Sequence, residues 1–295
     1  MPVAIFDMDG VLYRGNVVMP YACETLARLR QAGWQVFFAT NNSTASRAEY
    51  VARLTTLGLG GDADHVVTSA YATAHYLERC DPKPTDVFVV GADGLRDEIR
   101  AVGIGVRRAE DLPGADPPPE AAAAGVNPAA MREYLTHLEL PPLPDAVVVG
   151  LDLHLTYARL AEGQRALLGG ARFIASNKDR AYPVDGRLLP GAGSIVKALE
   201  VASGREALCI GKPEPFLFQE VLRRAGAAPG PVIVVGDAPE YDIVAAHRVG
   251  AVGILITTGL TDPSAVANAT GDAVPDHVIG SLDELFGLPE LAGVA

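Results

Sequence analysis

Two aspartates, Asp7 and Asp9, follow the apolar segment Val3–Phe6 and come just before Gly10. A short apolar run that ends in a turn residue is typical of a buried strand, and ligands of parallel sheets bind at the carboxyl ends of strands. Two carboxylates so close together repel each other, and a divalent cation relieves that repulsion. An EF-hand calcium loop is disfavoured because its twelfth position, counted from Asp7, is Val18 instead of glutamate. The pair therefore predicts an acidic, cation-binding strand end.

Further polar residues stand where other apolar segments end. Thr40 closes QVFFAT, and its hydroxyl could bind an anionic oxygen, although a lone threonine there more often bonds local backbone. Lys212 follows CIG and would neutralise an anion if it faced carboxylates; otherwise it is a solvated surface charge. Asp237 closes VIVVG, and its burial would need compensation. Asp242 stands near the start of the next helix, where an acid can simply complement the helix dipole.

Short apolar segments alternate with helical ones along the chain, which predicts a mostly parallel sheet covered by helices. Strands are expected at 3–6, 35–40, 87–91, 146–152, 172–176, 207–211, 231–236 and 251–257. Helices are expected at 20–33, 46–58, 69–79, 95–103, 156–169, 191–204, 215–226 and 242–250. Ser46 and Glu49 form a capping-box pattern at the start of the second of these helices.

Breaker residues divide this alternation. DPKP at 81–84 marks a boundary, and residues 106–145 lose the pattern in a Pro/Ala-rich insert with one short helix expected near 129–138. Such an insert is more often variable surface than active site. We therefore expect a discontinuous core of residues 1–82 and 206–295, with an α/β domain of residues 83–205 inserted into it.

The composition restricts the classes of function. The 295 residues are 49% hydrophobic and 20% charged, which suits a globular protein with a sizeable core. The formal net charge of −12 argues against broad nucleic-acid binding and against docking on an anionic membrane. Three widely spaced cysteines, Cys23, Cys80 and Cys209, give no disulfide framework, and neither a secretory signal nor a transmembrane run is evident. A cytoplasmic location is expected.

The order Asp-x-Asp, Thr, Lys, Asp-x4-Asp, each at a predicted strand end, resembles the haloacid dehalogenase superfamily of phosphohydrolases. The segments DMDGVLYRG, ATNNST, VVVGLDLHLTY, FIASNKD, LLPGAGSIVKALE, IGKPEP and VGDAPEYDI resemble its NagD-like, 4-nitrophenylphosphatase-type branch in sequence order. The resemblance covers nearly the whole chain apart from residues 106–145. It implies a Rossmann-like parallel-sheet core with an inserted α/β cap that shields the reaction and supplies specificity.

The resemblance also implies roles for the acidic residues. Asp7 would be the nucleophile that forms an aspartyl-phosphate, and Asp9 the acid and then the base of the reaction. Mg2+ would be held by Asp7, by the backbone carbonyl of Asp9 and by Asp237. Asp242 would fix a metal-bound water or Lys212.

Binding roles follow in the same way. Thr40, Asn41 and Lys212 would bind the phosphate, through the threonine hydroxyl, backbone N–H groups and the ammonium. In the cap, the loop SNKDRAY offers candidate substrate contacts at Asn177, Lys178, Asp179, Arg180 and Tyr182. The alternative for these five is an ordinary polar loop.

The expected activity is therefore Mg2+-dependent hydrolysis of a small phosphorylated metabolite. Sugar phosphates, nucleoside monophosphates, glycerol phosphate, phosphoglycolate and aryl phosphates all remain open, and related caps allow a homodimer. One alternative is a phosphotransferase or mutase, which would phosphorylate an acceptor without releasing phosphate. Another is a non-catalytic protein that binds a phosphorylated ligand, since a fold does not fix a function. The intact set of Asp7, Asp9, Thr40, Lys212 and Asp237 favours catalysis, because a binding protein does not need the acid-base group Asp9.

Overall fold

The structure is a computed structural model that describes residues 1–107, 142–184, 187–226, 230–258, 266 and 269–294. The expected helix near 129–138 and most of the 106–145 insert lie outside these residues. Among the described helices, none is long and apolar enough to cross a membrane.

Parallel strands of the two ends of the chain form one six-stranded sheet, with the order β15-β14-β13-β1-β4-β5. Its strands are β1 (Val3–Phe6), β4 (Gln35–Thr40), β5 (Val66–Thr68), β13 (Val232–Gly236), β14 (Val252–Ile256) and β15 (His277–Ile279). Strands β4 and β5 follow β1 on one side of it, and strands β13, β14 and β15 lie in sequence order on the other side. The strand order therefore reverses beside β1, which is where open α/β sheets bind their ligands.

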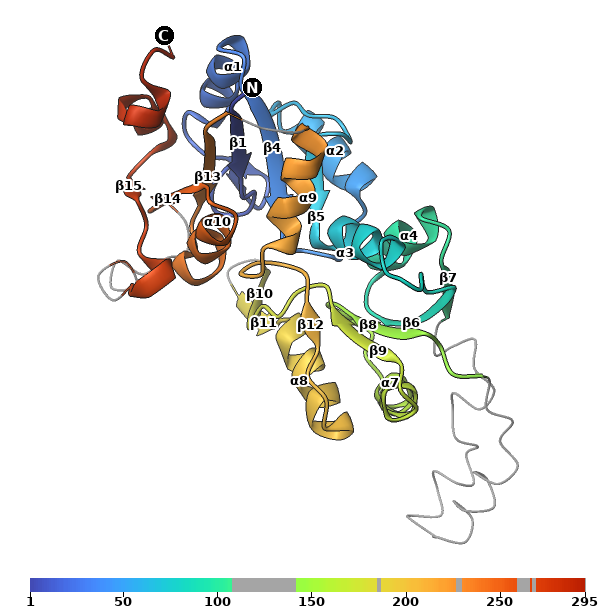
Figure 1. The fold of residues 1–295 in the computed structure, drawn as a ribbon. Coiled ribbons are helices and arrows are strands. Elements are labelled where there is room, and N and C mark those ends of the chain that lie inside the picture. The colour runs from blue at the N-terminus through green and yellow to red at the C-terminus, as the bar shows by residue number, and fades with distance from the viewer. Residues whose placement is uncertain (108–141, 185–186, 227–229, 259–265, 267–268, 295) are drawn as a thin grey trace, which may run out of the picture.

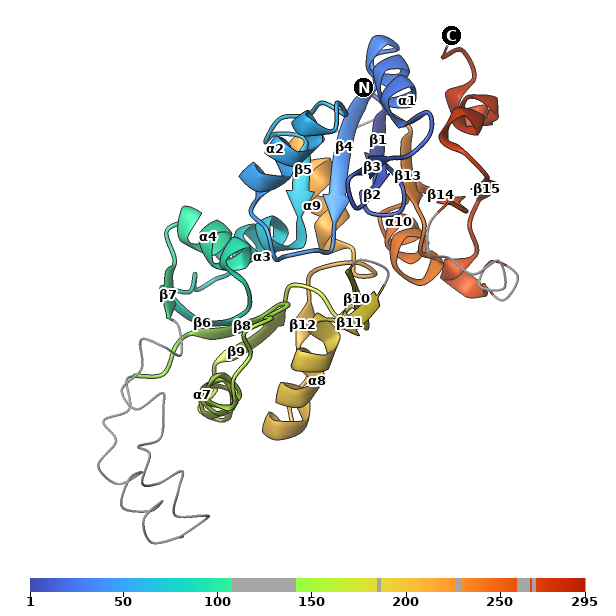
Figure 2. The same cartoon turned by 180° about the vertical axis from the view of Figure 1, so that it is seen from behind.

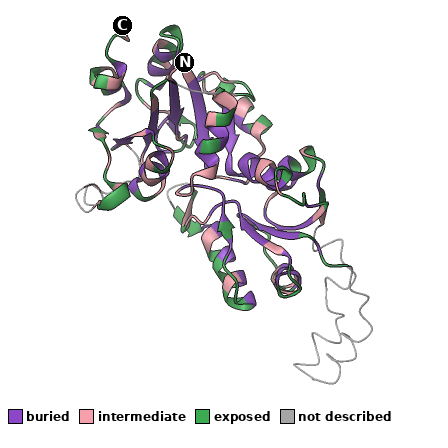
Figure 3. Cartoon of the chain, viewed as in Figure 1, coloured by how far each residue is buried: buried purple, intermediate pink, exposed green. Residues whose placement is uncertain are grey.

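Helices cover both faces of this sheet. They are α1 (Ala22–Gln31), α2 (Arg47–Thr56), α3 (Ser69–Glu78), α9 (Phe216–Ala225) and α10 (Val244–Arg248), with a π-helical turn at Pro239–Ile243 and 3-10 turns at Gly271–Ala273, Leu282–Gly287 and Pro289–Leu291. Alternate strand residues point to opposite faces. Ile5 thus packs with the helices α3, α9 and α10, whereas Phe6 packs with α1 and α2. Figure 3 shows that the strands are buried and the outer helix faces exposed.

A second parallel sheet has the order β12-β9-β8-β6-β7. Its strands are β6 (Asp86–Val90), β7 (Gly105–Arg107), β8 (Ala146–Val149), β9 (Arg172–Ala175) and β12 (Leu208–Cys209), and its helices are α4 (Asp93–Ala101), α7 (Tyr157–Leu168) and α8 (Ala192–Ser203). Two small antiparallel hairpins, β2 (Tyr13–Arg14) with β3 (Val17–Val18) and β10 (Ala181–Val184) with β11 (Arg187–Pro190), complete the described part. Figures 1 and 2 place β10–β11 between the second sheet and the six-stranded one.

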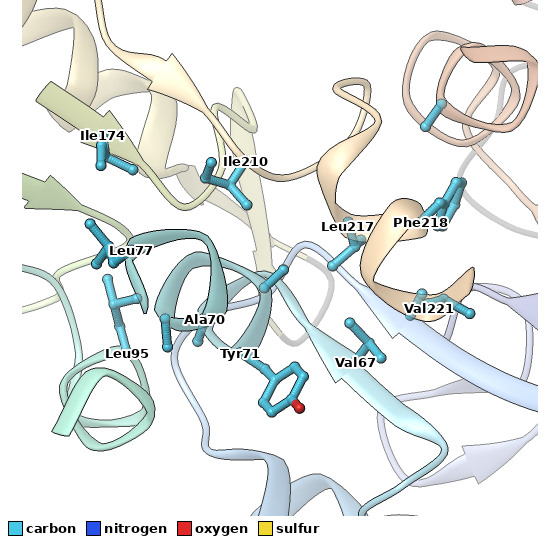
Figure 4. Close-up of a cluster of buried hydrophobic side chains, with 14 of the residues drawn as sticks. Val67, Ala70, Tyr71, Leu77, Leu95, Ile174, Ile210, Leu217, Phe218 and Val221 are labelled. Atoms are coloured by element: carbon cyan, nitrogen blue, oxygen red, sulfur yellow. The ribbon is translucent and has the colours of Figure 1, made fainter. Parts of the chain in front are cut away.

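One apolar cluster joins the two sheets. It contains Val67 and Leu217 of the six-stranded layer together with Leu95 and Ile174 of the second layer, and helix α3 lies between them (Figure 4). A separate cluster holds α7 and α8 on the far face of the second sheet. The two sheets are therefore joined by a shared apolar layer.

Most of the helices and strands agree with the expected ranges. Strand β5 and both hairpins are additional elements that were not expected. Strand β12 is paired with β9, so the second sheet ends after Cys209, a few residues beyond the expected 205. The helix expected at 242–250 begins as the π-helical turn Pro239–Ile243 and continues as α10. The division into core and cap domains stays a prediction.

Candidate active site

The three central strands of the six-stranded sheet each end in a predicted site residue. Asp7 follows β1, Asp237 follows β13 and Thr40 ends β4. The parallel register places Phe6 beside Val235 on one side and Phe38 on the other, and the Asp7 N–H donates to the Val235 carbonyl at 2.9 Å. Asp7 and Asp237 consequently leave neighbouring strands at the same edge of the sheet.

Lys212 is the positive centre of this edge. It lies in the loop between β12 and α9 and is only 3% exposed. Its Nζ donates to Asp7 Oδ1 at 2.6 Å and to Asp242 Oδ1 at 2.6 Å. Burial lowers the pKa of a lysine, but the Asp242 and Asp7 carboxylates outweigh it and raise the pKa of Lys212. The ammonium therefore stays charged and bridges the two acids.

Burial raises the pKa of Asp7 well above its usual range, and Lys212 opposes that rise. The Asp242 and Asp237 carboxylates add to it, because like charges disfavour ionisation. Lys212 thus bonds Asp7 and Asp242, and the Asp237 carboxylate adds to the negative charge at Asp7. A cation at this edge would favour the ionised form of Asp7, which is the nucleophilic form.

The carboxylate of Asp242 is held by a backbone N–H on one side and by the Lys212 ammonium on the other. Its Oδ2 accepts the Ala238 N–H at 3.1 Å, while Oδ1 faces Lys212. A Cβ at Gly236 would lie 2.3 Å from Asp242 Cβ, so only glycine permits this approach. Two partners were expected for Asp242, a metal-bound water or Lys212, and the structure shows the contact with Lys212.

Thr40 and Asn41 both lie in the site, and both side chains bond the backbone of neighbouring segments. The Thr40 hydroxyl accepts the Asn42 N–H at 3.1 Å and is buried. The Asn41 amide bonds the backbone of Lys212 on both sides: Oδ1 accepts its N–H at 2.7 Å and Nδ2 donates to its carbonyl at 3.0 Å. The Asn41 side chain therefore supports the backbone of Lys212.

Asp9 lies beside an arginine that the sequence analysis did not single out. Burial raises the pKa of Asp9, and Arg53 of helix α2 opposes the rise. Arg53 lies with its guanidinium carbon 4.6 Å from the centre of the Tyr13 ring and donates to the Gly15 carbonyl at 2.7 Å. It thereby fixes the hairpin after Asp9 to α2. Nothing in the spacing of the sequence pairs residues 9 and 53.

The five cap candidates separate into two groups. Asn177 is buried, and Lys178 donates to Glu200 at 2.9 Å and to the Ala207 carbonyl, so both have protein partners. Asp179 accepts from Asn41 Nδ2 at 3.1 Å, which connects the second layer to the first. Arg180 is exposed and Tyr182 half-buried at the start of β10. These two remain candidates for substrate contact.

The expected metal ligands are chemically suited to Mg2+, which prefers carboxylate and carbonyl oxygens and keeps several waters. Within the described residues, no three His, Cys, Asp or Glu side chains are clustered so as to hold a metal by themselves. The expected set needs only the side chains of Asp7 and Asp237, with the Asp9 carbonyl as a third ligand. The Asp242 and Asp237 carboxylates, which disfavour ionisation of Asp7, fit such an ion.

Comparisons with known proteins identify the family of the chain. The family model described as haloacid dehalogenase-like hydrolase matches residues 4–105, and a second, HAD-hydrolase-like model matches residues 209–285. Rat (Rattus norvegicus) chronophin is 36% identical over 293 residues, which cover 96% of this chain and 86% of that protein. These matches include both ends of the chain, which carry the residues described above.

Solved structures agree with the sequence matches. Glycerol phosphate phosphatase from Mycobacterium tuberculosis, in complex with magnesium, superposes with a TM-score of 0.78 at 30% identity, covering 96% of this chain and 75% of the other. 4-Nitrophenylphosphatase from Thermotoga maritima has a TM-score of 0.79 at 30% identity, covering 97% and 96% of the two chains. The chain therefore belongs to the haloacid dehalogenase-like hydrolase family, among the phosphatases of its 4-nitrophenylphosphatase-type branch.

Proposed function

We propose that the chain is a Mg2+-dependent phosphohydrolase that cleaves small phosphate monoesters through an aspartyl-phosphate on Asp7. The observation that carries this proposal is the placement of the Lys212 ammonium 2.6 Å from both Asp7 and Asp242. A buried cation beside a carboxylate at a strand end can hold the nucleophile and draw a phosphate to it.

In the first half of the reaction, an Asp7 oxygen attacks phosphorus and the bond to the leaving oxygen breaks. Asp9 gives its proton to that oxygen. The raised pKa of Asp9, which follows from its burial, favours the protonated form needed here. Phosphoryl transfer needs charge stabilisation above all, and Lys212 supplies it from the protein.

In the second half, Asp9 takes a proton from water, the water oxygen attacks phosphorus and the bond to Asp7 breaks. Phosphate leaves and both aspartates return to their starting states. Asp7, the Asp9 carbonyl and Asp237 would hold Mg2+, which when bound neutralises charge on the transferring phosphoryl group. Thr40 and the backbone after it would bind the non-bridging phosphate oxygens.

Residues 83–205 would act as the cap that excludes water, with Arg180 and Tyr182 as candidate substrate contacts. Names of relatives favour two substrate classes, since one similar structure is a glycerol phosphate phosphatase and another a 4-nitrophenylphosphatase. We therefore place polyol phosphates and aryl phosphates first, ahead of sugar phosphates, nucleoside monophosphates and phosphoglycolate. A cytoplasmic location and a homodimer through the cap stay part of the proposal.

The test is phosphate release from 4-nitrophenyl phosphate, glycerol phosphate and a panel of other monoesters, with Mg2+ and with EDTA. Release that needs Mg2+ supports the proposal and ranks the substrates. Release unchanged by EDTA contradicts the metal requirement. Phosphorylation of an added alcohol or sugar without phosphate release would instead identify a phosphotransferase, and ligand binding without turnover would identify a binding protein.

A further inference from the structure

The side chain of Asn41 connects Lys212 to the second sheet layer. Its Oδ1 accepts the Lys212 N–H at 2.7 Å, and its Nδ2 donates to the Lys212 carbonyl at 3.0 Å. The same Nδ2 group donates to both carboxylate oxygens of Asp179, at 3.2 and 3.1 Å. Both amide protons of Asn41 are thereby used, one on the lysine backbone and one on the loop after β9.

Asp179 determines the orientation of the Asn41 side-chain amide. An ionised carboxylate only accepts hydrogen bonds, so the NH2 end of Asn41 must face it and the oxygen end cannot. Turning the amide by 180° would bring its oxygen against the carboxylate and its NH2 group against the Lys212 N–H. The carboxylate thus selects the one orientation of Asn41 that satisfies the Lys212 backbone.

Asp179 is itself held by its own loop. Its Oδ2 accepts from Asn177 Nδ2 at 2.5 Å, and its carbonyl accepts the Gly193 N–H at 3.0 Å from helix α8. Asn177 is buried, and its Oδ1 accepts from the Ser176 hydroxyl at 2.8 Å. The position of Asp179 is therefore set by the second sheet layer and not by solvent.

The backbone before Lys212 leaves little space for adjustment. The Gly211 N–H donates to the Ser176 carbonyl at 2.8 Å. A Cβ at Gly211 would lie 2.6 Å from Asn41 Oδ1 and 2.7 Å from the Ser176 carbonyl oxygen. Gly211 is thus held between the loop after β4 and the loop after β9, and a shift of either loop would move the residue that precedes Lys212.

From these contacts we infer that Asp179 is a positioning residue, which sets the place of Lys212 through Asn41 and so couples the loop after β9 to the phosphate site. Its effect on turnover rests on the proposed function, whereas its effect on the Lys212 backbone does not. This role differs from the direct substrate contact considered for the loop. Direct contact would act on particular substrates, but positioning acts on the step that all substrates share.

The kinetic test compares Asp179→Ala and Asp179→Asn with Asp145→Asn. Asp145 is a cap carboxylate at the opposite, amino-terminal end of the second sheet, where its Oδ2 accepts from Thr85. Asp179→Ala is expected to lower kcat about tenfold or more, by the same factor for 4-nitrophenyl phosphate and glycerol phosphate, with KM within about twofold. Asp179→Asn keeps one acceptor oxygen and is expected to recover most of kcat. A KM increase that differs between the two substrates, with kcat unchanged, would overturn the positioning role in favour of direct contact.

A second readout does not depend on turnover. Hydrogen exchange of the Lys212 N–H reports its bond to Asn41 Oδ1, and we expect faster exchange in Asp179→Ala at unchanged Tm. Asp145→Asn is expected to leave that exchange at the wild-type rate. If Asp179→Ala does not fold, the comparison rests on Asp179→Asn, with a smaller increase expected. Unchanged Lys212 exchange in both variants would overturn the inference, whereas changed exchange in a protein without phosphatase activity would overturn only the proposed function.

Discussion

Lys212 holds a full positive charge among Asp7, Asp237 and Asp242, and its position decides what those acids can do. Lys212, Asp7 and Asp237 could be singled out from the sequence because each stands at the end of an apolar segment, and Asp242 because it stands near the start of the next helix. The resemblance implied contacts of Lys212 with the acids, but the partner of Asp242 stayed open. The sequence offered two partners for the Asp242 carboxylate, a metal-bound water or Lys212. The structure shows that this carboxylate accepts a hydrogen bond from Lys212.

The hydrogen bonds of the Asn41 side-chain amide were harder to predict than the positions of the charged residues. An asparagine after a strand gives no sign of which backbone it will bond, and the partners of Asn41 are far away in sequence at Asp179 and Lys212. The same holds for Arg53 beside Asp9, which comes from a helix whose apolar spacing predicts only its buried face.

A pH-dependent prediction concerns Glu200, which lies outside the site. Burial alone would raise its pKa, but hydrogen bonds from Lys178, Lys197 and the Ala207 N–H lower the pKa to about 2. A carboxylate whose folded pKa lies below its unfolded value stabilises the protein above the unfolded pKa, and loses that effect as pH falls toward the folded one. Glu200→Gln is expected to lower the free energy of unfolding by about 2 kcal/mol at pH 7.

The difference in the free energy of unfolding between Glu200→Gln and wild type should become smaller as pH falls from the ordinary carboxyl pKa, near 4.5, toward about 2. Urea unfolding at several pH values between 7 and 3 measures it. The exposed Glu206→Gln serves as the control and is expected to stay within about 0.5 kcal/mol of wild type. A difference that stays constant, or widens in acid, would contradict the assignment.

At the scale of elements, apolar runs and capping signals predicted the regular parts well. Helix α2 carries the expected capping box: Ser46 Oγ accepts the Glu49 N–H, and the Glu49 carboxylate accepts the Ser46 N–H. Strand β5 was missed because Val66–Thr68 is too short to show a period. The hairpin β10–β11 was missed because its residues are half-buried or exposed, so they do not alternate between apolar buried and polar exposed positions.

The π-helical turn at Pro239–Ile243 gives a prediction at this scale. It folds Asp242 back over the end of β13, where Gly236 leaves no space for a side chain. Gly236→Ala is expected to displace Asp242 from Lys212 and to lower kcat about 100-fold, because the lysine loses one of its two anchors. Steady-state kinetics and a thermal melt measure the effect on rate and stability.

Gly287→Ala is the matched control, since a Cβ there would meet no atom within 4 Å. It is expected to keep wild-type kcat. If Gly236→Ala also kept wild-type kcat while remaining folded, the contact between Asp242 and Lys212 would not be needed for turnover.

At the scale of the whole molecule, the two sheets share one apolar cluster, with α3 and α4 between them. A cap joined only by a flexible linker would unfold independently of the other sheet. Because both sheets contribute side chains to this cluster, we expect unfolding of one sheet to destabilise the other. We expect a single cooperative thermal transition, with a calorimetric enthalpy equal to the van't Hoff enthalpy.

Leu95 tests that dependence because it is fully buried in the shared cluster (Figure 4). Leu95→Ala is expected to cost about 2–5 kcal/mol and to move the whole transition to lower temperature in differential scanning calorimetry. Leu167→Ala removes a leucine from the separate cluster on the far face and provides the comparison. Two resolved transitions, of which Leu95→Ala moves only one, would contradict a shared core.

The proposed reaction requires Asp7 to carry the phosphoryl group during turnover. The most direct measurement is rapid acid quenching of the protein with a 32P-labelled monoester and Mg2+, followed by peptide mapping and treatment with hydroxylamine. The account predicts a hydroxylamine-labile label on the peptide that contains Asp7, absent from Asp7→Asn, together with loss of turnover in that variant. Full turnover by folded Asp7→Asn, or a label on another residue, would contradict it.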